Sequence, residues 1–325
     1  MHYFDIFNGD ADGICALRQL RLARPRPEAE LITGVKRDNA LLAQLAGRSE
    51  LAASVLTVLD ISLDRNREAL LALPAGCRVF YVDHHYAGAI PTAEGREFHI
   101  EPNPELCTSL IVDRLLEGRF RPWAVVGAFG DNLHGPARRA AAPLALAESD
   151  LQALREVGEL LNYNGYGARL ADLHFHPAEL YRAVGEFADP LEFHRHSAQL
   201  RALREGFARD LEQARRLPPL EEGPAGRVFR LPDQPWARRV AGVFANELAR
   251  ARPAQAHALL VEQGGEGLLV SVRAPLERPA GADDLCRRFP SGGGRAAAAG
   301  INALPLELLP AFLAAFAATF APPSP

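Results

Sequence analysis

Short apolar runs alternate with amphipathic stretches along the first part of the chain. Four runs rich in β-branched, aromatic and aliphatic side chains predict strands, at residues 2–7, 30–35, 54–59 and 78–82. Two segments with apolar positions at helical spacing predict helices, at residues 13–24 and 64–73. Strands that alternate with helices favour parallel pairing, so we expect a doubly wound parallel sheet.

Helical patterns dominate the middle of the chain. We expect helices at residues 106–117, 122–129 and 149–161, and one long charged helix at 190–216. Residues 217–224 are rich in proline and interrupt this pattern, which predicts a domain boundary.

The remainder of the chain returns to mixed α/β character. Strands are expected at residues 227–231, 257–262 and 267–273, and helices at 236–249, 282–289 and 306–320. The predicted fold class is therefore α/β. It has a larger N-terminal domain with the parallel doubly wound sheet, a smaller α/β C-terminal domain, and a cleft between them.

Composition narrows the function classes. The chain has 325 residues, 48% hydrophobic and 23% charged, with a formal net charge of −4, which excludes a disordered or collagen-like protein. No run of about 18 apolar residues occurs that would span a bilayer. The N-terminus lacks the layout of a signal peptide, so we expect a cytoplasmic protein. Four widely spaced cysteines without a Cys-x-x-Cys pair are typical of buried thiols, and the predominance of arginine over the single lysine, Lys36, is typical of coding bias.

Aspartates follow three of the predicted strands. Asp10 and Asp12 come after the first strand, Asp60 follows the third, and the triplet Asp83-His84-His85 follows the fourth. Because ligands gather at the carboxyl ends of parallel strands, we expect these side chains to converge. Neighbouring carboxylates raise one another's pKa unless a cation lies between them, and oxygen-rich sites with imidazole suit Mn²⁺ or Mg²⁺. The pattern predicts a metal centre, in which two ions roughly 3.5–4 Å apart would activate a water for phosphoryl displacement.

Each of these signals also has a purely structural explanation. An isolated Asp-x-Asp in a loop is usually a turn or a helix N-cap, and an isolated Asp-His-His is equally weak evidence. Their joint placement after three predicted strands favours the metal centre over this alternative.

The same residues resemble the motifs of the DHH phosphoesterase superfamily, which is named for the triplet seen here at residues 83–85. The first motif of the family matches Asn8-Gly9-Asp10-Ala11-Asp12-Gly13, the second matches Asp60, and the fourth matches Gly130-Asp131. The chain is most similar in plan to small nanoRNase or oligoribonuclease-like members, which are related to RecJ-type exonucleases. This resemblance implies a DHH metal-binding catalytic domain at 1–188, a connecting helix and linker at 189–224, and a DHH-associated substrate-binding domain at 225–325.

The resemblance also implies roles for individual residues. The implied metal ligands are Asp10, Asp12, Asp60, Asp83, His84 and Asp131, with Asp60 bridging two Mn²⁺ ions and Asp83 either a ligand or a supporting group. The implied catalytic residues are Asp60, His84 and His85, the last of them beside the substrate phosphate. The implied substrate-binding residues are Asn8, His85, Thr108, Ser109, Arg273, Gly292, Gly293, Gly294 and Arg295.

Two positions depart from the family pattern. The first motif begins with Asn8 where many small members have a metal-binding histidine; an amide carbonyl is a weaker ligand, so one ion would bind loosely. The glycine-rich loop at residues 292–294 ends in Arg295 where the family has histidine, and arginine grips a phosphate without exchanging protons near pH 7. For Thr108 and Ser109, helix capping explains the residues as well as phosphate contact does.

The charge pattern limits the expected substrate. Binding of long nucleic acid benefits from a basic stripe, but this chain has only short basic pairs such as Arg138-Arg139. We expect Mn²⁺-dependent, or Mg²⁺-dependent, hydrolysis of phosphodiester bonds in short oligonucleotides, dinucleotides or small nucleotides. The protein would be a monomer or homodimer without membrane or long-duplex partners. Two alternatives stay open: a phosphoanhydride hydrolase acting on pyrophosphate or a dinucleoside polyphosphate, and a catalytically weak nucleotide sensor.

Overall fold

The computed structural model of the protein describes residues 1–265 and 267–321. Two compact units divide the chain, the first from Met1 to Gly206 and the second from Phe207 onward. The three-part division predicted from the sequence, with a linker at residues 189–224, stays a prediction.

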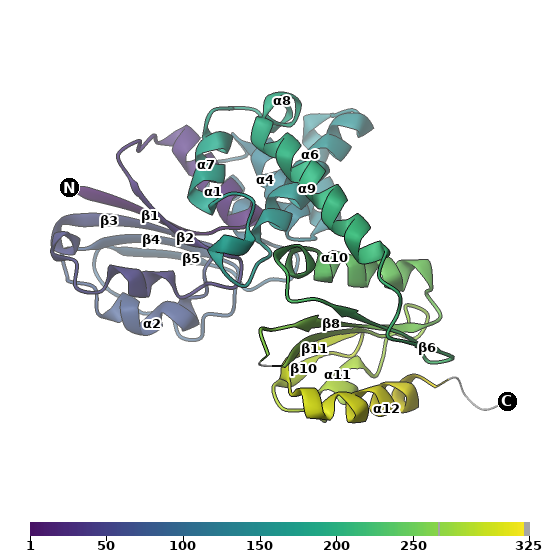
Figure 1. The fold of residues 1–325 in the computed structure, drawn as a ribbon. Coiled ribbons are helices and arrows are strands. Elements are labelled where there is room, and N and C mark those ends of the chain that lie inside the picture. The colour runs from purple at the N-terminus through teal and green to yellow at the C-terminus, as the bar shows by residue number, and fades with distance from the viewer. Residues whose placement is uncertain (266, 322–325) are drawn as a thin grey trace. The chain divides into compact units, whose positions relative to one another are not determined.

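A five-stranded parallel sheet forms the centre of the first unit (Figure 1). Its strands are β1 (His2–Asn8), β2 (Glu30–Gly34), β3 (Ser54–Leu59), β4 (Arg78–Asp83) and β5 (Arg96–Ile100). They follow the order β2-β1-β3-β4-β5, and every neighbouring pair is parallel. The predicted parallel sheet is therefore confirmed. The sequence did not reveal β5, because this edge strand is only partly buried and lacks a continuous apolar run.

Helices cover both faces of this sheet, as the doubly wound prediction requires (Figure 1). The unit contains α1 (Ala11–Ala23), α2 (Leu63–Leu71), α3 (Thr108–Leu115), α4 (Arg121–Gly130), α5 (His134–Ala141), α6 (Glu148–Gly165), α7 (Pro177–Gly185) and α8 (Pro190–His196). Helix α2 lies on one face, whereas α1, α4, α6 and α7 lie on the other. Helix α4 packs between α1 and α6 and is buried along almost its whole length.

The single long helix predicted at residues 190–216 is wrong. The structure has two helices there, α8 and α9 (Ala198–Arg215), separated by Ser197. Ser197 adopts an extended conformation with ψ 123°, and its hydroxyl accepts a hydrogen bond from the Leu200 backbone N–H at 3.2 Å. A serine in this position caps the N-terminus of a helix. One helix therefore ends and another begins here, although the charged sequence pattern is continuous.

The second unit has a six-stranded mixed sheet. Its strands are β6 (Glu221–Gly223), β7 (Gly226–Leu231), β8 (Ala256–Glu262), β9 (Leu268–Arg273), β10 (Gly292–Arg295) and β11 (Ala298–Leu304), in the order β10-β11-β9-β8-β7-β6. Only β7 and β8 pair in parallel among these described strands. The unit also contains the part of α9 from Phe207 onward, together with α10 (Pro235–Ala251), α11 (Ala282–Cys286) and α12 (Leu309–Phe320).

The glycine-rich segment of this unit is a strand rather than the predicted loop. Gly292, Gly293 and Gly294 form β10 with Arg295 and pair with β11 in antiparallel register. A Cβ on Gly292 would lie 1.9 Å from the Cys286 carbonyl oxygen, so only glycine fits against the end of α11. Gly294 is also closely packed, against Ala299, whereas a Cβ on Gly293 would meet nothing within 4 Å.

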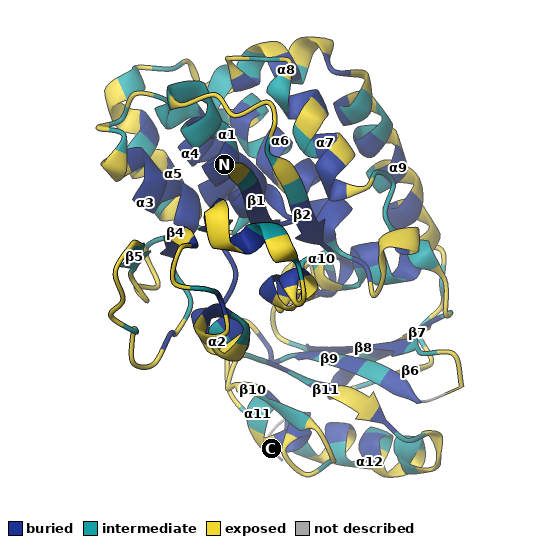
Figure 2. Cartoon of the chain, turned by 90° about the vertical axis from the view of Figure 1, so that its left-hand side faces the viewer, coloured by how far each residue is buried: buried dark blue, intermediate teal, exposed yellow. Residues whose placement is uncertain are grey.

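Each unit buries a hydrophobic core of its own, and Figure 2 shows buried residues on both sheets and on the helices that pack against them. Phe4, Leu56 and Tyr81 belong to the core of the first unit; Val270 and Phe312 belong to that of the second. Each such side chain contributes about 1.5–3 kcal/mol to folding. All four cysteines are buried and free, as predicted. Within the described residues, no helix is both long and apolar enough to cross a membrane.

Candidate metal centre

The carboxyl edge of the first sheet gathers the predicted acidic residues. Asp10 and Asp12 follow β1, Asp60 follows β3, and Asp83 is the last residue of β4. All four are at most 2% exposed. Asp131 joins them from the C-terminal end of α4. Parallel strands explain this convergence, since their carboxyl ends share one edge.

Asp10 caps helix α1. Its Oδ1 accepts hydrogen bonds from the backbone N–H groups of Asp12 at 3.0 Å and Gly13 at 3.1 Å. A Cβ on Gly13 would lie 2.2 Å from the Asn8 carbonyl oxygen, so glycine is required for this tight turn from strand to helix. The turn aims the other oxygen of Asp10, Oδ2, at the Lys36 ammonium, 2.5 Å away.

Asp12 is held by the N-terminus of α3. The Thr108 N–H donates to its Oδ2 at 2.7 Å, and the Ser109 N–H donates to its Oδ1 at 2.8 Å. A helix N-terminus stabilises a carboxylate both through its free N–H groups and through its dipole. The structure thus gives Thr108 and Ser109, both completely buried, a positioning role. Their contact with a substrate phosphate stays a prediction, and these hydrogen bonds do not support it.

Asp60 has a backbone conformation that is rare for a non-glycine residue, with φ +58°. Such a conformation costs on the order of 1–3 kcal/mol and persists only where surrounding contacts enforce it. Here the Thr108 hydroxyl donates to Asp60 Oδ1 at 3.0 Å, and the same oxygen lies 3.4 Å from His84 Nε2. The strained turn and the two contacts together fix the direction of the carboxylate.

The two histidines of the triplet have different surroundings. His84 Nε2 lies 3.4 Å from Asp60 Oδ1 and 3.7 Å from Asp131 Oδ2. His85 Nδ1 lies 2.7 Å from Asp83 Oδ1, while Asp83 Oδ2 is buried without a hydrogen-bond partner among the described residues. Asp83 therefore supports His85 in this structure, which is one of the two roles expected for it.

The acidic cluster shifts the pKa values of its members. Burial raises the pKa of Asp60 well above its ordinary value, and the charges of Asp12 and Asp10 add to the rise. Burial alone lowers the pKa of His84, but Asp60, Asp12 and Asp131 reverse the effect and raise it to about 10. Both pKa shifts arise because the clustered negative charges lack enough positive charge nearby. A divalent ion would supply that charge, and its binding would displace the His84 proton.

The donor atoms fit a divalent ion. Ligand atoms of Asp12, His84 and Asp131 lie within 4.8 Å of one another, and so do those of Asp60, His84 and His85. His84 belongs to both groups. Carboxylate oxygens with one or two imidazole nitrogens form a donor set typical of Mn²⁺ and Mg²⁺.

Sequence reasoning missed the role of Lys36 in this centre. Its Nζ contacts Asp10 Oδ2, the Asn162 Oδ1 on α6 at 3.1 Å, and Asp131 Oδ1 at 3.3 Å. Burial lowers the pKa of Lys36, but Asp10 and Asp131 outweigh that effect and raise it well above its ordinary value. One signal was available: Lys36 lies two residues beyond the end of β2, at the same sheet edge as the aspartates. Asn162 has no comparable signal, because it lies inside a long helix.

The predicted phosphate-binding residues of the second unit share one side of its sheet. Arg295 lies opposite Ala298, Ala298 opposite Arg273, Arg273 opposite His257, and His257 opposite Arg227. Residues directly opposite one another on neighbouring strands point to the same face. We call Arg227, His257, Arg273 and Arg295 the arginine row. Whether they bind substrate stays a prediction.

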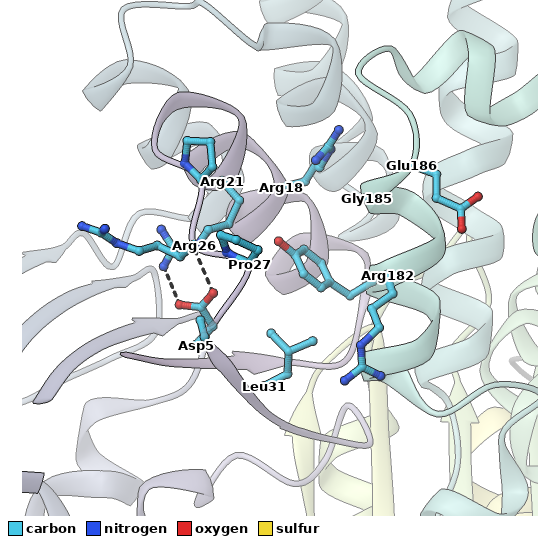
Figure 3. Close-up of a pocket in the computed structure, with 12 residues that line it drawn as sticks. Asp5, Arg18, Arg21, Arg26, Pro27, Leu31, Arg182, Gly185 and Glu186 are labelled. Atoms are coloured by element: carbon cyan, nitrogen blue, oxygen red, sulfur yellow. Dashed lines mark hydrogen bonds and ion pairs between the residues drawn. The ribbon is translucent and has the colours of Figure 1, made fainter. Parts of the chain in front are cut away.

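A separate pocket of about 520 Å³ lies in the first unit, and Figure 3 shows its lining. Arg18, Arg21, Arg26 and Arg182 contribute to it, and Asp5 lies below Arg21 and Arg26 in this view. Arg21 Nε donates to Asp5 Oδ2 at 2.8 Å, so part of this positive charge is neutralised within the pocket. None of the predicted site residues lines it.

Comparison with known proteins identifies the fold. No protein-family model matches the sequence, and no curated protein matches it. A DHH domain protein described as a member of a family of ribosomal proteins is 14% identical, with a TM-score of 0.59 over 98% of this chain and 86% of that one. An exonuclease RecJ bound to manganese is 20% identical, with a TM-score of 0.55 over 98% of this chain and 89% of that one. The chain has the fold of the DHH proteins.

A third solved structure is similar to this chain over the full length of both proteins, apart from 2% of this chain. A pGpG-specific phosphodiesterase, PggH from Vibrio cholerae, is 11% identical, with a TM-score of 0.51 over 98% of this chain and 100% of that one. The predicted DHH resemblance is therefore confirmed for the fold, which includes both the parallel sheet and the second sheet. Asn8, which matches the first motif by sequence resemblance, is 4% exposed. Its Nδ2 donates to the Lys36 carbonyl oxygen at 3.4 Å.

Proposed function

We propose that the protein is a divalent-metal-dependent phosphoesterase that hydrolyses phosphodiester bonds of dinucleotides or short oligonucleotides. The observation that carries this proposal is the convergence of Asp12, Asp60, His84 and Asp131. They come from four separate segments, and ligand atoms of Asp12, His84 and Asp131 lie within 4.8 Å of one another, while Asp60 Oδ1 lies 3.4 Å from His84 Nε2. Buried carboxylates without a matching number of cations are costly unless a metal binds, so stability alone does not explain the arrangement.

The side chains of this centre divide the work of the reaction. A bound divalent ion supplies a more acidic water and positive charge for the phosphate oxygens. Asp12, Asp60, His84 and Asp131 hold that ion. The α3 N-terminus fixes Asp12, and the Thr108 hydroxyl fixes Asp60, so both carboxylates are oriented before substrate arrives.

His85 is the residue that we assign to the substrate phosphate. Its Nδ1 is engaged by Asp83 at 2.7 Å, which orients the ring and leaves Nε2 as the nitrogen available to a phosphate oxygen. The side chain is 40% exposed, whereas that of Asp83 is fully buried. A buried carboxylate behind a partly exposed imidazole is an arrangement suited to stabilising charge that develops on substrate.

The proposed substrate size rests on charge and on the neighbouring folds. The net charge of −4 and the absence of a basic run in the sequence argue against tracking along long nucleic acid. A pGpG-specific phosphodiesterase is among the structures with this fold, and it is covered over its full length. In the second unit, the arginine row places three guanidinium groups on one sheet face, and Arg295 is the exposed one, which suits contact with a phosphate.

A substrate panel tests the proposal. Purified protein would be incubated at one Mn²⁺ concentration with a dinucleotide, a long single-stranded DNA and pyrophosphate, with and without chelator. We expect chelator-sensitive conversion of the dinucleotide to mononucleotides and little product from the long strand. Preferential hydrolysis of pyrophosphate would replace the phosphodiester assignment, and no metal-dependent product from any member of the panel would contradict the proposal.

A further inference from the structure

The ammonium of Lys36 is bound by oxygen atoms on three sides. Asp10 Oδ2 lies at 2.5 Å, Asn162 Oδ1 at 3.1 Å and Asp131 Oδ1 at 3.3 Å. An ammonium has three N–H donors and no acceptor, so these three oxygens satisfy it completely. The Tyr166 ring adds a weaker contact, with Nζ 5.9 Å from its centroid. The centre therefore contains a fitted cation supplied by the chain itself.

The contact with Lys36 removes Asp10 from the metal-ligating groups. Its Oδ2 contacts the positively charged ammonium, and its Oδ1 accepts two backbone hydrogen bonds. Asp12 also accepts two backbone hydrogen bonds, but these come from neutral N–H groups. Within residues 1–265 and 267–321, neither group of closely spaced ligand atoms includes Asp10. The two groups of ligand atoms, Asp12 with His84 and Asp131, and Asp60 with His84 and His85, share His84. His85 is engaged by Asp83, so we assign Asp12, Asp60, His84 and Asp131 to one ion.

The backbone around Lys36 is anchored so that its side chain enters the centre. The Lys36 N–H donates to the Gly165 carbonyl oxygen at 3.0 Å, and the Lys36 carbonyl oxygen accepts from Asn8 Nδ2 at 3.4 Å. Asn8 thus contacts the residue that supplies the cation, at the sequence position where a histidine ligand was expected. This hydrogen bond goes to the Lys36 backbone, so Asn8 helps to place the chain at Lys36 and does not contact the ammonium.

We propose that the Lys36 ammonium takes the place of one of the two divalent ions expected from the DHH resemblance, so that this centre binds a single divalent ion. This inference rests on the proposed function and revises only the number of ions. Asp12, Asp60, His84 and Asp131 hold the ion, while Lys36 neutralises Asp10 and one oxygen of Asp131.

Metal stoichiometry tests the inference without any activity assay. Purified protein would be saturated with Mn²⁺, freed of excess metal and analysed by elemental mass spectrometry and electron paramagnetic resonance. We expect one ion per chain and the spectrum of an isolated Mn²⁺. Two ions per chain with an exchange-coupled spectrum would overturn this inference and leave the proposed function standing. No bound ion would overturn both, so the two failures are distinguishable.

Variants of Asn8 and Lys36 sharpen the test. In the double variant Asn8→His/Lys36→Ala, the expected histidine ligand is restored and Asp10 Oδ2 is released. We expect a second Mn²⁺ per chain and an exchange-coupled spectrum. Arg37→Ala is the matched control, because it removes the exposed positive charge next to Lys36 and should leave one ion. If the double variant is folded by circular dichroism and still binds one ion, Lys36 is not what excludes the second, and the inference fails.

Discussion

The two units of this protein place side chains of opposite character on their sheets. The first gathers carboxylates at the carboxyl edge of a parallel sheet, whereas the second aligns arginines and a histidine across the face of a mixed sheet. The pKa values of two histidines differ accordingly. Burial lowers the pKa of His84, but the neighbouring aspartates outweigh this effect and raise it to about 10. That of His257 is lowered to about 4 by burial and by Arg227 and Arg252. The aspartates of the first region favour a bound cation, as a metal-dependent phosphate reaction requires, whereas binding of a substrate anion by the arginine row stays a prediction.

The largest expected effect comes from removing a carboxylate of the first region. Asp60→Asn keeps the shape of the side chain but removes a charged ligand that contacts both His84 and Thr108. We expect metal-dependent cleavage of a dinucleotide to fall by roughly 10³-fold, because a ligand to a catalytic ion supports several kcal/mol of transition-state stabilisation. Initial rates at saturating Mn²⁺ measure the loss.

The control is Asp64→Asn, an exposed aspartate in the first turn of α2. It removes the same charge from the same unit without touching the centre, and its rate should match that of the unaltered protein. Equal losses in the two variants would mean that Asp60 acts through general charge rather than as a ligand.

A smaller effect is expected from the hydroxyl that orients Asp60. Thr108→Val removes the 3.0 Å hydrogen bond to Asp60 Oδ1 while preserving side-chain volume. We expect Mn²⁺ to bind about 10–100-fold more weakly, which is the usual cost of losing an outer hydrogen bond to a ligand. Isothermal titration calorimetry measures the affinity. Thr108→Ser keeps the hydroxyl and should retain most of it; the same weakening in both variants would assign the effect to packing.

The second region should lose stability in acid. His257 has its ordinary pKa when the chain is unfolded and a pKa of about 4 when folded, so the unfolded chain binds the proton more readily. Its neutral form therefore gives full stability above about pH 6.5, and that stability falls as pH drops towards 4. After allowance for screening by solvent, we expect a loss of roughly 2 kcal/mol. Hydrogen exchange of β8 and β9 amides in the full chain measures it.

Replacing the histidine should flatten this pH dependence. His257→Gln keeps an acceptor for Arg227 but does not titrate. The exposed His2→Gln provides the control, since it removes one histidine without changing the arginine row. If exchange in the second unit responds to acid equally in both variants, His257 is not the responsible group.

The pH dependence expected from His84 has the opposite sign. Its pKa is raised in the folded protein, so its proton stabilises the metal-free first unit fully below about pH 6.5. That contribution is lost as pH rises through about 10.

The smallest expected effect concerns substrate binding by the arginine row. Arg295→Ala removes an exposed guanidinium at the edge of the sheet. We expect KM for a dinucleotide to rise about tenfold with little change in kcat, which corresponds to one charge-assisted hydrogen bond. Arg288→Ala, an exposed arginine just beyond α11, is the control. A fall in kcat at constant KM would show that Arg295 does not simply bind substrate.

The sequence predicted the acidic centre better than the second unit, for physical reasons. Asp12, Asp60 and Asp83 could be placed together because buried parallel strands have continuous apolar runs and share one carboxyl edge. Lys36 also follows the carboxyl end of a parallel strand, β2, but a single lysine is not part of any sequence motif that would mark it as functional. In the second unit, β10 consists of three glycines and an arginine. It forms a hairpin with β11, which begins three residues after Arg295. Glycine is depleted in strands, so the local pattern predicts a loop, and only the pairing with β11 makes this segment a strand.

The most direct test of the account is anomalous diffraction at the manganese edge from crystals grown with Mn²⁺. The account predicts one anomalous peak at the carboxyl edge of the first sheet, bounded by Asp12, Asp60, His84 and Asp131, with the Lys36 ammonium still on Asp10. The absence of a peak there would contradict the metal centre on which the proposed function depends. A pair of peaks with Lys36 displaced would contradict its role as the resident cation.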